Sequence, residues 1–202
     1  MKDRLMGIEL LPKYIREHYE VHEWKHACAI LKHDFPEEWN DVVNVLSNFK
    51  LCKTWITTPG GGKSKISQAI DSSLYERGWR ERMFHTSVIV DSEEMDSPTH
   101  KVDCYKNKIA LEIEWNNKDP FYDRDLNNFR LLFDLRVISV GIIVTRCDEL
   151  QQLVVELGRA AQSYGQSTTH MSKLIPKIQG GGSGGCPLLV FGISRKLFDE
   201  RC

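Results

Sequence analysis

Two glutamates lie two residues apart in an apolar segment, a spacing that puts both side chains on one face of a β-strand. They are Glu112 and Glu114 in segment 109–115, whose other residues are all apolar. Because side chains alternate between the faces of a strand, one face would be buried through Ile109, Leu111, Ile113 and Trp115, and the other would carry Ala110, Glu112 and Glu114. Like charges at this distance repel, so we expect a cation to hold the two carboxylates together.

A third carboxylate precedes this pair. Asp103 lies nine residues before Glu112, and a short turn near Asn107 would fold its strand back beside the next one. Asp103, Glu112 and Glu114 would then converge. Oxygen ligands of this kind suit Mg²⁺, and a bound divalent ion assists the attack of water on a phosphate. The spacing therefore predicts Mg²⁺-dependent hydrolysis of a phosphodiester.

The acidic pair also has a simpler interpretation. A strand with the pattern Glu-x-Glu often faces solvent and pairs its acids with lysines on the neighbouring strand. Lys101, Lys106 and Lys108 are close enough in the sequence for this role. Short motifs also occur often by chance. If Glu112 and Glu114 pointed into open solvent, the enzymatic interpretation would fail.

The segments around these acids resemble a known nuclease motif. Asp103, eight intervening residues and then Glu112-Ile113-Glu114 resemble the PD-(D/E)XK motif, with Val102 at the place of Pro and Glu114 at the place of the usual Lys. The following segment 115–121, WNNKDPF, is similar to type II restriction endonucleases of the BglII and BstYI group. The resemblance extends to the strand at 188–193, whereas the N-terminal part matches less clearly.

This resemblance implies an α/β fold, in which a restriction-endonuclease-like core has a central mixed β-sheet flanked by helices. It also implies Mg²⁺-dependent cleavage of double-stranded DNA by a type II restriction endonuclease. Asp103 and Glu112 would be metal ligands. The BglII-like enzymes carry Gln at the place of Glu114 and the BamHI-like enzymes carry Glu, so Glu114 would orient or deprotonate the attacking water, or hold a second metal.

Two polar loops would face the DNA bases by the same resemblance. Asn and Lys side chains suit adenine and guanine edges, and lysines also reach phosphates. We expect the DNA-binding residues to be Asn116, Asn117, Lys118, Gln166, Ser167, Thr168, Thr169, His170 and Lys173. Ordinary turn chemistry explains the two asparagines equally well, and a solvated surface loop would explain 166–170.

One chain carries one such site, whereas a double-strand break needs two. We therefore expect a homodimer with two-fold symmetry at a palindromic site, and the resemblance implies a GATC-centred one. The alternative is a non-catalytic or methylation-reading DNA-binding module on a nuclease fold. A third, nucleotide hydrolysis by the Gly60–Ser64 loop, lacks the first Gly of the phosphate-binding pattern because Thr57 stands there.

Composition is that of an ordinary globular protein. The 202 residues include 41% hydrophobic and 27% charged side chains, with a net charge of −1. This excludes a disordered chain, and no apolar run approaches the ~20 residues of a membrane helix. The N-terminus lacks a signal-peptide core, and the six cysteines form no CxxC pair. We expect a cytoplasmic protein with reduced thiols, folded as one nuclease domain over 1–202 with an N-terminal part (1–60) and a catalytic core (61–202).

The expected elements follow from periodicity and turn residues. We expect helices over 36–50, 64–77, 125–136 and 148–159. The third would begin at Asp125, and Asp148 would cap the fourth. We expect strands over 83–91, 100–106, 108–115, 138–145 and 186–193. Segment 93–98 is expected to be a polar turn and 180–185 a Gly-rich flexible linker, whereas 19–31 mixes helix and strand signals and stays open.

Overall fold

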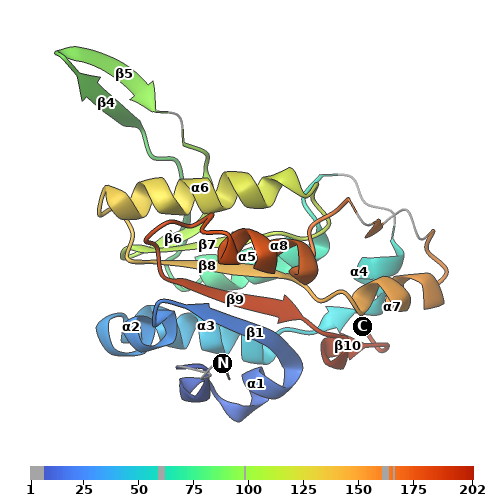
Figure 1. Ribbon diagram of the computed structural model, residues 1–202. Helices are drawn as coiled ribbons and strands as arrows, with labels where there is room; N and C mark the ends of the chain where they lie inside the picture. Colours follow the sequence, from blue (N-terminus) through green and yellow to red (C-terminus); the bar gives the residue numbers. More distant parts are fainter. Residues whose placement is uncertain (1–6, 59–61, 98, 161–163, 166) are drawn as a thin grey trace.

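A computed structural model describes residues 7–58, 62–97, 99–160, 164–165 and 167–202. Its centre is a six-stranded sheet in the order β1-β9-β8-β7-β6-β3 (Figure 1). The strands, in that order, are Tyr19–Trp24, Leu188–Ile193, Val140–Arg146, Ile109–Ile113, Val102–Lys106 and Arg80–Arg82. Pairings β7/β8 and β8/β9 are parallel and the other three are antiparallel. The predicted mixed α/β sheet is confirmed.

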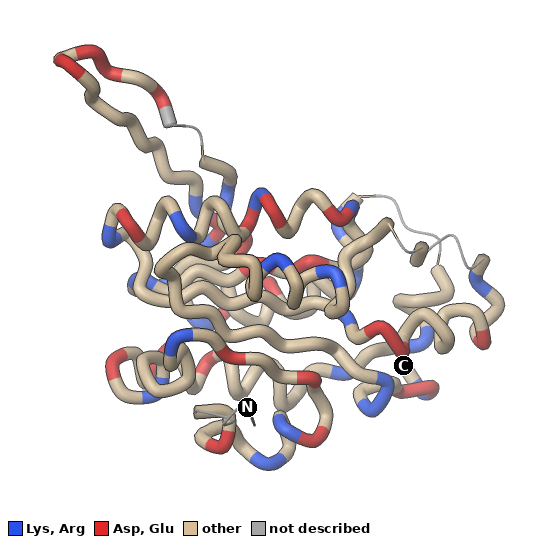
Figure 2. Tube along the Cα trace, in the orientation of Figure 1, with Lys and Arg blue, Asp and Glu red and all other residues tan. Residues whose placement is uncertain are grey.

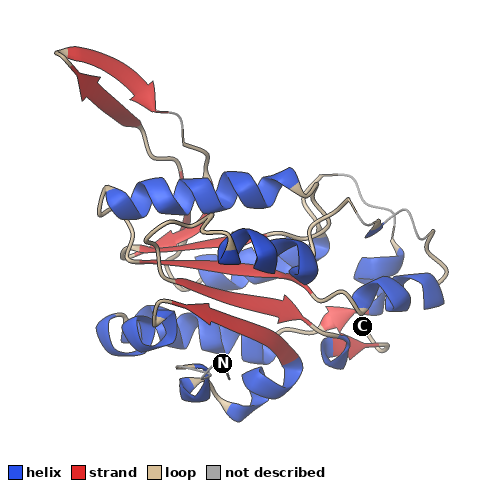
Figure 3. Cartoon of the chain, viewed as in Figure 1, coloured by secondary structure: helices blue, strands red, loops and turns tan. Residues whose placement is uncertain are grey.

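Two apolar cores lie on opposite faces of this sheet (Figure 3). Alternate residues of β7 enter different cores, Leu111 on one face and Ala110 on the other. The first core includes buried residues of α1 (Lys13–His18), α2 (Ala27–Asp34), α3 (Pro36–Asn48) and α5 (Lys65–Tyr75). The second includes α6 (Pro120–Asp134) and α8 (Met171–Gln179). Because both faces are covered, β7, β8 and β9 are buried along their whole length.

Several predicted elements are confirmed with small shifts of their ends. Ser64 accepts a hydrogen bond from the backbone of Ser67 at 2.9 Å and so caps α5. The turn between β6 and β7 falls at Asn107 and Lys108, which both have positive φ, as a two-residue hairpin turn requires. Segment 19–31 resolves into β1 followed by the start of α2.

The region after β3 differs from the prediction. Instead of one strand and a polar turn, β4 (Thr86–Val90) and β5 (Glu93–Ser97) form a hairpin that extends away from the body of the molecule (Figure 1). The turn is only Asp91-Ser92, both at positive φ. The residues of β5 have low strand propensity, so they do not indicate a strand by themselves. The strand forms because it pairs with β4.

Two other expectations were wrong. Asp148 does not cap α7 (Leu150–Glu156), because its carboxylate accepts hydrogen bonds from Ser172 N at 3.0 Å and Ser172 Oγ at 2.6 Å. Residues 180–185 are a packed turn rather than a flexible linker. A Cβ on Gly182 would lie 2.9 Å from the carbonyl oxygen of Lys177, so only glycine permits this close approach.

The expectation of reduced cysteines is wrong for one pair. The short strand β2 (Leu51–Cys52) lies parallel to β10 (Phe198–Asp199). This pairing places Cys52 beside Cys202, and the two form a disulfide across 150 residues of chain. The free cysteines of the described residues are Cys28, Cys104, Cys147 and Cys186, all buried.

The remaining short elements complete the fold. They are the α-helix α4 (Lys53–Thr57) and the 3-10 helices η1 (Ile8–Leu10) and η3 (Arg195–Leu197). Among the described residues, no helix combines the length and the apolar character needed to cross a bilayer.

Candidate active site

The β6–β7 hairpin brings Asp103 and Glu112 into contact where its backbone ladder ends. Cys104 and Leu111 are the last ladder partners on that side, and beyond them side chains replace backbone carbonyls as acceptors. The backbone N–H of Asp103 donates to Glu112 Oε2 at 3.2 Å. The backbone N–H of Ile113 donates to Asp103 Oδ2 at 3.0 Å. Each acid is therefore fixed by the opposing strand.

The solvated interpretation of the acidic pair is excluded by burial. Glu112 is 1% exposed and Glu114 is 2% exposed, because α6 covers the sheet face that carries them. The lysines expected to neutralise them pair elsewhere, Lys101 with Glu81 and Lys106 with Glu37 and Asp41. Lys108 is exposed at the hairpin turn. The sequence predicted which face carries the acids, but not that a helix buries it.

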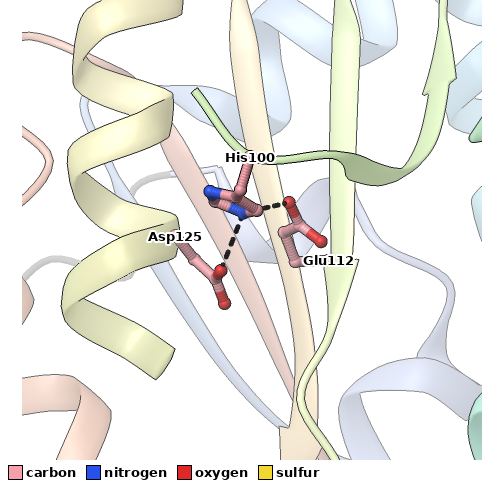
Figure 4. A group of neighbouring side chains, drawn as sticks. All are labelled: His100, Glu112 and Asp125. Atoms are coloured by element: carbon pink, nitrogen blue, oxygen red, sulfur yellow. Dashed lines mark hydrogen bonds and ion pairs between the residues drawn. The ribbon is translucent and has the colours of Figure 1, made fainter. Parts of the chain in front are cut away.

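His100 lies between two of the buried acids (Figure 4). Its Nε2 is 3.2 Å from Glu112 Oε1 and 3.1 Å from Asp125 Oδ1. Asp125, on α6, is fully buried. Its other carboxylate oxygen, Oδ2, has no hydrogen-bond partner among the described residues. This is an uncommon state for a buried carboxylate.

Glu114 is held from two directions. Asn117 Nδ2 donates to Glu114 Oε2 at 2.8 Å, and Arg124 Nη2 lies 3.4 Å from Glu114 Oε1. The same guanidinium donates to Asp125 Oδ1 at 2.8 Å. Arg124 is thus the cation that faces Glu114 and Asp125 from α6, while its side chain remains partly exposed.

Burial is the largest cause that raises the pKa of each proposed catalytic acid. The pKa of Glu114 rises to about 9, with the charge of Asp125 as the next cause. The pKa of Glu112 rises well above its usual value through burial, Asp125 and Asp103. The pKa of Asp103 also rises, although the N–H of Ile113 opposes the shift. Carboxylates that lie this close together offer several oxygen ligands, and a hard divalent cation would offset their mutual repulsion.

A cleft of ≈ 680 Å³ opens beside this cluster. Asp103 lines it directly, together with Asn116 and Asn117, whereas Glu112 and Glu114 lie behind its wall. Three of its other lining residues are cations, namely Lys63, Lys65 and Arg159. Lys63 is paired with Asp71, and Glu81, which also lines the cleft, is paired with Lys101. An anionic polymer entering this cleft would therefore meet Asp103 together with Lys65 and Arg159.

Sequence reasoning missed several residues of the cluster, and one of them left a signal. Asp125 occupies the buried stripe of α6 that also carries Tyr122, Phe129 and Leu132, so an acid stands at a core-facing position.

The Gly-rich loop before α5 lines part of the cleft, and one ion pair holds it in place. Lys63 and Asp71 form this pair, which joins the loop to α5. The ammonium of Lys63 is therefore engaged by Asp71 rather than free to meet a phosphate. Gly60 and Gly61 of the loop lie outside the described residues.

The two loops expected to face DNA lie against each other. Lys118 forms an isolated β-bridge with Thr168. The backbone N–H of Asp119 donates to Ser167 O at 2.9 Å, and that of Thr169 donates to Asn117 O at 2.8 Å. Segments distant in sequence thus form one rim beside the end of β7.

Hydrogen bonds inside the protein occupy many of the side chains of this rim. Asn117 Nδ2 serves Glu114, Thr169 Oγ1 accepts from Asn117 N at 3.1 Å, and Thr168 Oγ1 accepts from Arg146 Nη2 at 2.9 Å. His170 Nδ1 lies 2.7 Å from Asp148 Oδ1.

The exposed members of the rim are few. Lys118 and Ser167 are exposed, and Lys173 is half-buried at a second cleft beside Arg146. Asn116 is partly buried and lines the first cleft. Gln166 lies outside the described residues.

A family model described as restriction endonuclease BglII/BglIII matches residues 19–193. The match begins at β1 and ends at β9, so it covers the central sheet, the three acids and both loops. No curated protein matches the chain.

Proposed function

The chain belongs to the restriction endonuclease BglII/BglIII family and is a site-specific deoxyribonuclease, and from this premise we propose that it uses Mg²⁺ to cleave a short palindromic, GATC-centred site in double-stranded DNA. The observation that carries the Mg²⁺ assignment is the contact between Asp103 and Glu112 beside a cleft that Asp103 lines. Their carboxylates supply the oxygen donors that Mg²⁺ prefers.

The proposed roles of the three acids follow from where each one lies and which residues hold it. Asp103 and Glu112 would hold the ion, since both meet at the end of the hairpin next to the cleft. When bound, the ion would neutralise the charge that develops on the scissile phosphate. Glu114, fixed by Asn117 and Arg124, would orient the attacking water or accept its proton.

The test is cleavage of unmethylated plasmid DNA by the purified chain. With Mg²⁺ we expect discrete fragments, and with EDTA none. Glu112→Gln keeps the size of the side chain and should abolish cleavage while leaving DNA binding largely intact. Glu76→Gln, on an exposed residue just after α5, is the matched control. Sequencing the fragment ends would identify the site.

The alternative remains a non-catalytic or methylation-reading DNA-binding module. It predicts specific retention of DNA without strand scission under every metal tested. The acidic cluster favours the catalytic assignment, because a module that only binds DNA has no use for the buried carboxylates of Glu112 and Glu114 with their unfavourable desolvation.

A homodimer is part of the proposal, since two sites are needed to cut both strands of a palindrome. The β4–β5 hairpin supplies a surface for the second copy. It carries the exposed apolar residues Val88, Ile89, Val90 and Met95. An isolated two-stranded hairpin is marginally stable in water, so a second copy packed on it would stabilise it.

Charge favours a protein as the occupant of this surface. Between residues 86 and 97 the chain contains four acids and no Lys or Arg, and Figure 2 shows acidic residues at the tip of the hairpin. This segment would repel a phosphate backbone. From the DNA substrate we infer that the protein acts in the cytoplasm.

A further inference from the structure

We propose that His100, Glu112 and Asp125 form a second metal site, which takes a borderline transition-metal ion such as Co²⁺ or Zn²⁺ and shares Glu112 with the Mg²⁺ site. The three donor atoms lie within 4.8 Å of one another. Figure 4 shows the side chains pointing toward a common point from the segment before β6, from β7 and from α6. The inference deepens the proposed function and rests on it only through the shared Glu112.

Two of the three distances between the donor atoms match those in a coordination sphere, and the third is within 4.8 Å. Bonds of about 2.1 Å from an ion to its ligands place neighbouring ligand atoms about 3.0 Å apart in octahedral geometry and about 3.4 Å apart in tetrahedral geometry. His100 Nε2 lies 3.2 Å from Glu112 Oε1 and 3.1 Å from Asp125 Oδ1. An ion can therefore enter the group with little movement of the side chains.

The charge balance of the pocket also calls for a cation. Glu112 and Asp125 are 1% and 0% exposed, and Arg124 is the guanidinium that reaches this buried group. Asp125 Oδ2 is buried without a hydrogen-bond partner among the described residues. A carboxylate oxygen without a partner and away from water is unfavourable, and an ion coordinated by both oxygens of Asp125 would relieve that cost.

The donor types set the kind of ion. An imidazole nitrogen suits borderline ions such as Co²⁺ and Zn²⁺, whereas Mg²⁺ prefers oxygen ligands. Glu112 has one oxygen on each side, because Oε1 faces His100 and Oε2 faces the backbone N–H of Asp103. It can thus contribute to both sites. The ion at His100 would fasten α6 to β7 and fix the direction of Glu112.

The test is a titration of the EDTA-treated full chain with Co²⁺, followed by its visible absorption. We expect one Co²⁺ to bind with bands that a large excess of Mg²⁺ does not abolish. His100→Gln and Asp125→Asn should each weaken this binding by more than about 10-fold, since loss of a residue that only orients a ligand already costs that much, whereas Asp103→Asn should retain it. His33→Gln, on an exposed residue of α2, is the matched control, and circular dichroism checks that each variant is folded.

The proposal is overturned if His100→Gln and His33→Gln bind Co²⁺ with the same affinity and spectrum, or if Asp103→Asn alone abolishes the bands. If His100→Gln fails to fold, Asp125→Asn decides by the same criteria. Co²⁺ bands that depend on His100, in a protein that does not cut DNA, would support this site and contradict the proposed function. Cleavage with Mg²⁺ by a protein that shows no such Co²⁺ bands would support the proposed function and overturn the second metal site.

Discussion

Asn117 Nδ2 donates a hydrogen bond to Glu114 Oε2 at 2.8 Å. The backbone of the same residue exchanges two hydrogen bonds with Thr169, one to its Oγ1 and one from its N–H. Asn117 therefore joins a proposed catalytic acid to both loops of the proposed DNA-facing rim. A shift of that rim on binding DNA would move the direct partner of Glu114, which couples recognition to chemistry.

Asn117→Ala should slow DNA cleavage by about 10–100-fold, the usual cost of removing a residue that orients an active-site ligand. DNA binding should change less, because the amide is turned toward Glu114. Single-turnover cleavage and a gel-shift titration measure the two effects. Asn48→Ala, on the exposed end of α3, should leave both unchanged. Equal losses in cleavage and binding would show that Asn117 acts as a base contact instead.

The metal-free protein should lose stability as the pH rises. Burial raises the pKa of Glu114 to about 9, whereas the unfolded chain titrates near pH 4.3. Between these values the folded state holds a proton that the unfolded state has lost, so the free energy of unfolding falls with pH. The slope is at most about 1.4 kcal/mol per pH unit for each such proton.

Thermal unfolding in EDTA from pH 5 to 9 measures this slope. Glu114→Gln should reduce this slope, because the amide does not titrate while Glu112 and Asp103 still do. Mg²⁺ should reduce it in the parent protein by stabilising the ionised acids. A melting temperature that rises with pH in EDTA would contradict the burial of these acids in solution.

Lys118 should contribute to DNA affinity mainly through charge. It is exposed beside the cleft and bridges to Thr168 through its backbone. Lys118→Ala should reduce the slope of log affinity against log salt by about one, with the selected site unchanged. Lys13→Ala, at an exposed residue of α1, serves as the control. A change of the cleaved sequence would instead assign Lys118 to base recognition.

The hairpin should control the oligomeric state. Ile89 is 71% exposed on β4, and Ile89→Lys would place a charge in the proposed contact with a second copy. We expect this variant to shift from dimer to monomer in light scattering and to lose double-strand cleavage. Val155→Lys, the same kind of change at an exposed apolar residue on α7, should remain dimeric. If both variants behave alike, the hairpin is not the contact.

The sequence was most informative where local patterns decide structure. Alternation placed Glu112 and Glu114 on one face, and Ser64 marked the start of α5. The partners of the acids could not be predicted from the sequence, because they depend on how distant segments pack. His100 and Asp125 meet Glu112 only after α6 folds onto the sheet.

Turn chemistry and packing explain the other errors. The hairpin turn at Asp91-Ser92 needs two positive φ angles, which neither residue type demands. Gly182 resembles linker sequence, yet its lack of a side chain is required by its contact with Lys177. Asp125 was the exception, since an acid within an apolar helical stripe is a signal that the residue pattern itself carries.

The bond between Cys52 and Cys202 turns most of the chain into a covalent ring. Every element from α4 to β10 lies inside that ring, including both strands of the β6–β7 hairpin and the projecting β4–β5 arm. A protease that nicks the arm would therefore leave two fragments that migrate together until a reductant is added. The molecule can thus be cut at its most exposed point without its parts separating.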